Sequence, residues 1–240
     1  MLYSIGNDAV TLALFDLDNT LLAGDSDHAW GEFLVELGVV DARHYADANQ
    51  KFYDQYLVGD LDIYEFCRFA FQPLKDHPQQ QLESWRQQFL QEKIQPMLLD
   101  HGICKIQWHR ARNDTPVIIT ATNTFVTELI AQALDVEHLI ATQPEIKAGR
   151  FTGEIEGIPC FQGGKVQRLE AWMQSHDETL NDSWFYSDSH NDLALLEKVT
   201  HPVAVDPDPL LRTQSEQRGW KILSFRGTPS DADCALTESS

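Results

Sequence analysis

Basic side chains are scarce in this sequence. Its 18 lysines and arginines stand against 37 aspartates and glutamates, which gives a formal net charge of −19. Proteins that bind nucleic acid need a positively charged surface to contact the phosphate backbone, so this composition argues against a nucleic-acid partner. The same excess of acid disfavours binding to an anionic membrane surface.

Cysteines are few and scattered. The four of them contain no C-x-x-C pair, so they match neither a zinc site nor the disulfide framework of a small secreted domain. They are Cys67, Cys104, Cys160 and Cys234. We expect them to be thiols in a reducing compartment.

Long apolar runs are absent as well. No stretch approaches the roughly 20 apolar residues that a transmembrane helix needs. Residues 1–10 show neither the basic nor the apolar segment of a secretory signal. We therefore expect a soluble, cytoplasmic protein that does not act at a membrane. Apolar side chains still make up 42% of the 240 residues, which is enough for a substantial core.

A short apolar run followed by two acids organises the chain. Residues 10–15 predict a buried strand, and Asp16 and Asp18 follow it, with Thr20 two residues further on. In open parallel sheets, ligands bind at the carboxyl ends of the strands. Two carboxylates this close repel each other unless one is protonated or a cation lies between them, and Mg²⁺ would suit them. Taken alone, the pattern equally fits an acidic turn that caps a helix.

Residues 22–96 differ in character from the rest of the chain. They are rich in aromatic residues and helix formers. Apolar side chains recur at helical spacing in four segments, at 30–37, 45–56, 61–71 and 82–94. Gly38 and Gly59 follow the first two segments, and Pro73 and Pro96 follow the others, as expected at helix ends. We therefore predict a helical insert between the first strand and the rest of the chain.

Strand and helix patterns alternate after this insert. Short apolar, β-branched runs predict strands at 116–120, 139–142, 184–187, 202–205 and 221–225. Helices are predicted at 125–134, from 163 onward, after 192 and at 210–219. In the first of these helices we expect Ala133 to lie on the buried face. A hairpin is predicted at 149–157. Such alternation is typical of an α/β protein with a mostly parallel sheet and helices on both faces. We expect the acidic tail after Gly227 to be frayed.

Six polar residues lie either at the ends of predicted strands or at the starts of predicted helices that face those strand ends. They are Asp16, Asp18, Thr120, Lys165, Asp188 and Asp192. The set fits phosphoryl transfer, with Asp16 as the nucleophile that forms an aspartyl-phosphate and Asp18 as general acid and base. Thr120 and the N–H groups around Ala121 would bind phosphoryl oxygens, while Lys165 would offset their charge.

The acids of this set also predict a metal site. Asp16, Asp188 and the carbonyl of Asp18 would hold Mg²⁺, and Asp192 would orient either Lys165 or a metal-bound water. Each residue has a simpler explanation as a helix cap, a first-turn acid or a strand end. The whole set in this order is much harder to obtain by chance.

These residues resemble the four motifs of the haloacid dehalogenase (HAD) superfamily. Residues 119–123, 164–165 and 186–193 are similar to its phosphoserine-phosphatase-like branch, subfamily IB, and the helical insert is similar to a C1 cap. The resemblance covers about residues 12–223. It implies a Rossmann-like catalytic core formed by residues 1–21 and 97–240, a cap formed by 22–96, and a Mg²⁺-dependent phosphatase. It also places Asn191 near the substrate phosphate.

The substrate is less sharply indicated. Phosphoserine phosphatases have Ser-Gly-Gly at the second motif, where this chain has residues 120–122 as Thr-Ala-Thr. They also have a glutamate at the start of the cap that binds the substrate amine and a cap arginine that binds its carboxylate. Asp25 and Arg68 are the candidates here, and His28 lies nearby. Bacterial relatives are linked to histidinol phosphate, so we expect a small cationic or zwitterionic phosphorylated metabolite.

Other functions remain open at this point. A phosphotransferase would use the same aspartyl-phosphate and pass the phosphoryl group to an alcohol. A non-catalytic phosphate-binding protein would keep the fold without the acids, and a response-regulator receiver domain is too short and has no helical insert. We expect the insert to act as a lid and the protein to be a monomer or a homodimer.

Overall fold

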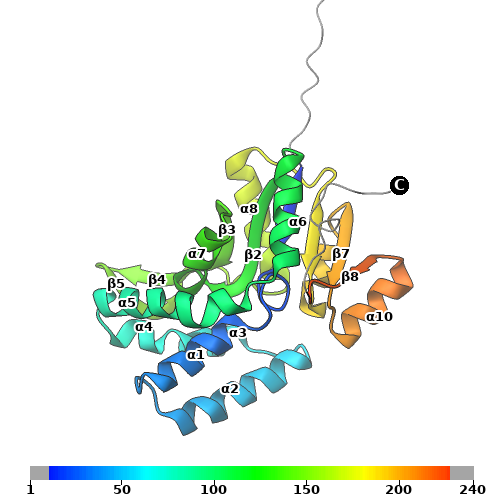
Figure 1. Ribbon diagram of the computed structural model, residues 1–240. Helices are drawn as coiled ribbons and strands as arrows, with labels where there is room; N and C mark the ends of the chain where they lie inside the picture. The colour runs from blue at the N-terminus through cyan, green and yellow to red at the C-terminus, as the bar shows by residue number, and fades with distance from the viewer. Residues whose placement is uncertain (1–10, 228–240) are drawn as a thin grey trace, which may run out of the picture.

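The fold is built on a six-stranded parallel sheet with the strand order β3-β2-β1-β6-β7-β8 (Figure 1). The structure is a computed structural model and describes residues 11–227. The strands are β1 (Leu12–Phe15), β2 (Thr115–Asn123), β3 (His138–Thr142), β6 (Trp184–Ser187), β7 (His201–Val205) and β8 (Lys221–Leu223). The predicted α/β class and parallel sheet are confirmed. Val10, predicted as the start of the first strand, lies outside the described residues.

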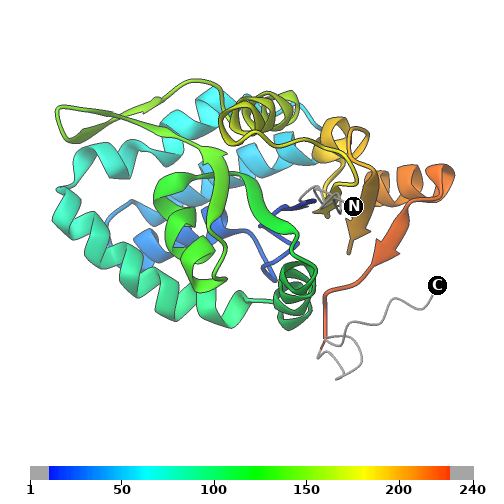
Figure 2. The same ribbon diagram turned by 90° about the horizontal axis from the view of Figure 1, so that it is seen from above.

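Both faces of the sheet are buried, because successive side chains of a strand point to opposite sides. Leu12 and Leu14 of β1 belong to one apolar core, and Ala13 and Phe15 belong to the other. The core around Phe15 includes α6 (Asp100–Ala111) and α7 (Thr124–Ala133). The opposite core includes α8 (Gly163–His176), α9 (Leu193–Leu196) and α10 (Pro209–Arg218). Figure 2, seen from above, shows α6 and α7 across the sheet from α8.

Two details of these helices differ from the prediction. Helix α6 was not predicted, because its buried residues include Gly102 and His109 as well as Ile106 and Trp108, and so give no apolar stripe. In α7 the side chain of Ala133 is exposed, while Leu134 directly after the helix is buried.

The strands and turns show smaller differences. Strand β2 continues to Asn123, three residues beyond its predicted end, with a register shift against β3 after Ile119. The predicted hairpin begins five residues earlier, as β4 (Pro144–Lys147) and β5 (Arg150–Ile155).

The insert is helical, as predicted, and lies beyond the carboxyl ends of the strands, at the bottom of Figure 1. Its helices are α1 (Ser26–Glu36), α2 (Ala42–Leu57), α3 (Ile63–Ala70), α4 (Gln72–Asp76) and α5 (Gln79–Phe89), followed by a π-helical turn η1 (Leu90–Ile94) and a 3-10 turn η2 (Gln95–Met97). Strand β5 packs against α3 and α4, so a segment from after β3 joins this helical layer.

Two glycines end the first two helices of the insert in the same way. Gly38 and Gly59 have φ angles of +69° and +74°. The N–H of the residue after each glycine donates to a carbonyl in the preceding turn, Val39 to Leu34 and Asp60 to Gln55. This Schellman arrangement satisfies the last helical carbonyls and favours glycine, which has no Cβ. The predicted stops are therefore confirmed.

Aromatic side chains join part of the insert to the sheet layer. The ring of Trp30 in α1 lies 5.1 Å from that of Phe89 in α5 and 5.8 Å from that of Phe125 in α7. Helix α2 is attached differently, since its buried side chains are Tyr45 and Phe52 alone. Helix α1, which has six buried residues, is thus more firmly held than α2.

The cysteines divide into two groups. Cys67 and Cys160 are buried free thiols, as expected. Cys104 is disulfide-bonded, so the expectation of a thiol is wrong for this residue. Spacing along a chain does not report which cysteines meet in space, which is why the sequence did not show it. Cys234 lies outside the described residues.

Within residues 11–227, no helix is both long and apolar enough to span a membrane.

We predict that Gly164 tolerates no side chain. A Cβ at this position would collide with the carbonyl oxygen of Pro159, whereas a Cβ on the neighbouring Gly163 would meet no atom within 4 Å. Gly164→Ala should therefore lower the free energy of unfolding by about 1–3 kcal/mol. Gly163→Ala, the matched control, should change it by less than about 0.5 kcal/mol or raise it slightly. Urea unfolding of both variants is the measurement, and equal stabilities would contradict the steric argument.

Candidate active site

The loops after β1 and β6 meet at the centre of the sheet, where the strand order reverses. Such reversal points are where open α/β sheets bind ligands. The N–H of Asp16 donates to the carbonyl of Tyr186 at 2.9 Å. The hydroxyl of Thr20 donates to a carboxylate oxygen of Asp188 at 3.3 Å and accepts the N–H of Asp188 at 3.1 Å. The first and fourth predicted motifs are therefore held side by side.

Lys165 joins the third motif to both of them. Its Nζ donates to Oδ1 of Asp16 at 2.7 Å and to Oδ2 of Asp192 at 2.8 Å, and all three residues are buried. The same oxygen of Asp192 accepts the hydroxyl of Ser187 at 2.6 Å. Asp192 thus orients Lys165, which is the first of the two roles that the sequence left open for it.

The charges in this group shift one another's titration. Burial alone would lower the pKa of Lys165, but the carboxylates of Asp16 and Asp192 outweigh it and raise the pKa, so the lysine stays charged. Burial raises the pKa of Asp16 to about 7, against the opposing effect of Lys165. Asp16 and Asp192 share the single positive charge of Lys165, so these three residues carry more negative than positive charge when both acids are ionised.

The carboxylate of Asp18 points to a different set of donors. Its Oδ1 accepts the N–H of Ser26 at 2.6 Å, and its Oδ2 accepts the hydroxyls of Thr122 at 2.8 Å and Thr120 at 3.4 Å. Burial raises its pKa to about 6. A carboxyl group with a pKa close to neutral can both donate and accept a proton at physiological pH, as a general acid and base must.

Thr122 and Ser187 are polar contacts that the sequence prediction missed. Thr122 lies two residues after Thr120 and therefore on the same face of β2. That period of two was visible in the sequence and could have identified it. Ser187 is the last residue of β6, and no local pattern distinguishes it from an ordinary strand end.

The donor set fits Mg²⁺. In the described part of the chain, no three His, Cys, Asp or Glu side chains form a metal-binding group by themselves. Burial and the charge of Asp16 raise the pKa of Asp188 well above its usual range, so a cation is needed to keep both ionised. Mg²⁺ takes few carboxylates and completes its shell with carbonyl oxygen, water and phosphate. Asp16, Asp188 and the carbonyl of Asp18 match that preference, while the Asp192 carboxylate is engaged by Lys165 and Ser187.

A cavity of about 830 Å³ lies between these residues and the helical insert. Eight residues predicted for catalysis, substrate or metal binding line it, namely Asp16, Asp18, Asp25, Thr120, Ala121, Lys165, Asn191 and Asp192. Asn191 is buried, and its Oδ1 accepts the side-chain amide of Gln162 at 3.0 Å. Helix α2 forms much of the opposite wall. The structure thus brings nearly the whole predicted set to one enclosed space.

The two substrate-binding residues predicted in the insert, Asp25 and Arg68, differ in whether they reach the cavity. Asp25 caps α1 by accepting the N–H of His28 at 2.9 Å, and both residues also line the cavity. Arg68 is exposed on α3 and does not line the cavity, because α3 turns Ile63, Phe66 and Ala70 toward it. The predicted contact of Arg68 with a substrate carboxylate is not supported by this placement.

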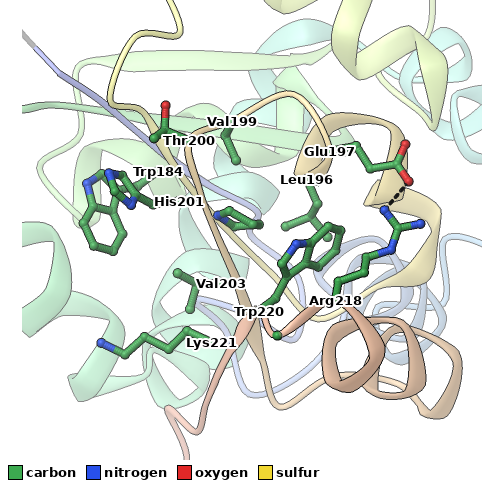
Figure 3. Close-up of a pocket in the computed structure, with 12 residues that line it drawn as sticks. Trp184, Leu196, Glu197, Val199, Thr200, His201, Val203, Arg218, Trp220 and Lys221 are labelled. Carbon is green, nitrogen blue, oxygen red and sulfur yellow. Dashed lines mark ion pairs between the residues drawn. The ribbon is translucent and has the colours of Figure 1, made fainter.

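A second hollow lies at the other end of the sheet (Figure 3). Trp184, His201 and Lys221, which line it, are the first residues of β6, β7 and β8. Its wall also carries an ion pair between Arg218 and Glu197. Because it lies at the amino ends of the strands, it is remote from every predicted motif.

Comparison with known proteins agrees with this geometry. The family model of the haloacid dehalogenase-like hydrolases matches residues 13–197. The chain is 39% identical over 219 residues to a histidinol-phosphatase of Neisseria meningitidis, covering 90% of this chain and 99% of that protein.

Solved structures share the fold. A protein of unknown function from Bordetella pertussis Tohama I is 41% identical, with a TM-score of 0.85 over 90% of this chain and 99% of that one. A phospho-aspartyl intermediate analogue of phosphoserine phosphatase is 19% identical, with a TM-score of 0.66 over 91% and 94% of the two chains. The chain therefore belongs to the haloacid dehalogenase-like hydrolases, and within that family it is a phosphatase.

Proposed function

We propose that this protein is a Mg²⁺-dependent phosphomonoesterase that acts on a small phosphorylated metabolite through an aspartyl-phosphate on Asp16. The observation that carries the proposal is the pair of acids with separate partners. Asp16 is held by Lys165 at 2.7 Å, whereas Asp18 is held by Ser26 and Thr122. Lys165 favours the ionised form of Asp16, whereas Asp18, whose pKa burial raises to about 6, is placed to exchange a proton.

In the first step, a carboxylate oxygen of Asp16 attacks the phosphorus atom of the ester. The bond between phosphorus and the ester oxygen breaks, and Asp18 gives its proton to the departing oxygen. Thr120 and the N–H groups around Ala121 face the same cavity and would hold the phosphoryl oxygens, and Lys165 balances their negative charge. The products are an alcohol and the aspartyl-phosphate.

In the second step, water attacks the phosphorus atom of the aspartyl-phosphate. Asp18, now ionised, accepts a proton from that water, the bond to Asp16 breaks, and inorganic phosphate leaves. Asp16, Asp188 and the Asp18 carbonyl would hold Mg²⁺, which when bound screens the phosphoryl oxygens from the attacking carboxylate. The helical insert forms the opposite wall of the cavity and would limit the access of bulk water.

Phosphate release from a panel of esters tests the reaction class. We expect release from p-nitrophenyl phosphate and from at least one of histidinol phosphate and phosphoserine in the presence of Mg²⁺. EDTA in excess should reduce the rate at least a hundredfold, and added Mg²⁺ should restore it. Appearance of a phosphorylated alcohol in place of inorganic phosphate would instead identify a phosphotransferase. Release that EDTA does not affect would contradict the metal requirement.

Asp16→Asn should abolish turnover while the fold is kept. Asparagine has the same shape and can still accept the hydrogen bond from Lys165, but its amide does not form the acyl phosphate. We expect the rate constant kcat to fall at least a thousandfold, with the circular dichroism spectrum unchanged. A variant that retained a tenth of the wild-type rate would rule out Asp16 as the nucleophile.

Asp18→Asn should slow both chemical steps, because neither proton transfer can occur. We expect kcat to fall by about 10²–10⁴. The loss should be smaller for p-nitrophenyl phosphate, whose leaving group needs little protonation, than for an alkyl phosphate. Rapid-quench kinetics with both esters measures this, and equal losses would argue against the acid role of Asp18.

A further inference from the structure

The cavity above Asp16 is strongly acidic. Seven of the residues that line it are acids, namely Asp16, Asp18, Asp25, Asp27, Glu32, Glu36 and Asp192. Among the described residues of its wall, Lys165 is the one lysine or arginine. A phosphate ester that enters this space adds further negative charge, so the rest of the substrate must suit an acidic surrounding.

Most of these acids already have partners. Four of them contact a basic side chain: Asp16 and Asp192 contact Lys165, Glu36 contacts Lys93 at 2.7 Å, and Glu32 contacts His28 at 3.5 Å. Asp18 accepts bonds from Ser26 and Thr122, and Asp25 accepts the N–H of His28. Of the seven acids, Asp27 has the fewest groups that offset its negative charge.

Asp27 lies in the first turn of α1, at the junction of the insert and the sheet layer. In the described part of the chain, its side chain accepts one hydrogen bond, from the amide of Asn123 at a long 3.4 Å. Asn123 ends the strand that carries Thr120, so Asp27 stands close to the phosphate-binding residues. Burial raises the pKa of Asp27 well above its usual range, and the charges of Asp25 and Asp18 raise it further. A positive group beside it would relieve this cost.

Aromatic rings complete the wall around these acids. Tyr45, Phe52, Tyr53 and Tyr56 come from α2, and Phe66 comes from α3. Aromatic faces attract ammonium and guanidinium groups and stack with flat rings. Tyr45 and Asp27 line the same cavity, and burial together with the charge of Asp27 raises the pKa of Tyr45. The wall therefore offers negative charge and π faces together.

We propose that Asp27, supported by Asp25, binds a cationic group of the substrate, and that this substrate is a phosphate monoester with an ammonium group and no carboxylate. The proposal rests on the proposed function. Asp27 acts as a specificity residue, because it contacts the leaving alcohol and not the reacting atoms.

The same charges exclude an amino-acid phosphate such as phosphoserine. Its carboxylate would enter a space whose one lysine already holds Asp16 and Asp192. Arg68, the residue predicted to receive a carboxylate, lies outside the cavity wall. Histidinol phosphate has an ammonium group and a flat imidazole and lacks the carboxylate, so it matches the wall in each respect.

Three matched esters separate these effects in the wild-type enzyme. Ethyl phosphate has no charged group other than its phosphate. Ethanolamine phosphate has an ammonium group in addition, and phosphoserine has both an ammonium group and a carboxylate. We expect kcat/KM to rise at least tenfold from the first ester to the second and to fall at least tenfold from the second to the third. Histidinol phosphate should exceed phosphoserine at least a hundredfold. Equal values for phosphoserine and histidinol phosphate would overturn the proposal.

The variant Asp27→Asn tests the residue. The ratio of kcat/KM for histidinol phosphate to that for ethyl phosphate should fall at least tenfold, chiefly through KM, and Asp27→Glu should recover part of it. Asp47→Asn is the matched control, because Asp47 is an exposed acid of the insert outside the cavity wall, and its ratio should stay at the wild-type value. An unchanged ratio in Asp27→Asn would overturn the assignment.

The experiments distinguish a failure of the proposed function from a failure of the assignment of Asp27. If ethyl phosphate and p-nitrophenyl phosphate are hydrolysed but the ammonium group gives no advantage, the proposed function stands and the assignment of Asp27 is wrong. If no ester is hydrolysed by the wild-type enzyme, the proposed function is wrong, and the substrate assignment is lost with it. Thermal unfolding of each variant identifies losses that come from misfolding.

Discussion

The buried contact of Lys165 with Asp16 and Asp192 is the interaction on which the site depends. The three residues come from different elements, and Lys165 and Asp16 are 149 positions apart in the chain. A buried charge that loses its partner costs several kcal/mol, so each of these groups requires the other two. The fold can satisfy them only if β1, α8 and η3 (His190–Asp192) come together at one edge of the sheet. The same contact favours the ionised form of Asp16, which lines the cavity.

The sheet supplies the frame for this contact, and the insert supplies its surroundings. Parallel strands end together, so the loops that follow β1, β2 and β6 converge without any special device. What the insert adds is enclosure and charge, since its acids and aromatic rings form the wall that faces the sheet. In the proposed mechanism, chemistry and selectivity thus belong to different parts of the chain, which is how one scaffold can serve many phosphate esters.

The sequence predicted the sheet, the helical insert and most of the polar side chains that line the cavity, because each leaves a local pattern. The acids after the first strand and Lys165 in the first turn of a helix are visible without a structure. Helix α6 was not, because Gly102 and His109 occupy buried positions where apolar residues are expected. Arg68 lies outside the cavity wall, and the sequence did not show this because the composition of a helix of 8 residues does not fix which of its faces meets the cavity. The contact between Asp27 and Asn123 joins residues 96 positions apart, and no local pattern reports such a contact.

The unequal attachment of the helices in the insert bears on how a substrate enters. Moving the whole layer would pull Trp30 and Phe89 out of their contacts with the core, and both are buried. Helix α2 is held to the loops of the sheet layer through Tyr56, whose hydroxyl lies 2.8 Å from that of Ser189, and its own buried side chains number two. Breaking one partly buried hydrogen bond costs about 1 kcal/mol, less than separating an aromatic core. We therefore expect α2, and not α1, to move when the cavity opens, and a change at Tyr56 to alter both that motion and the cavity wall.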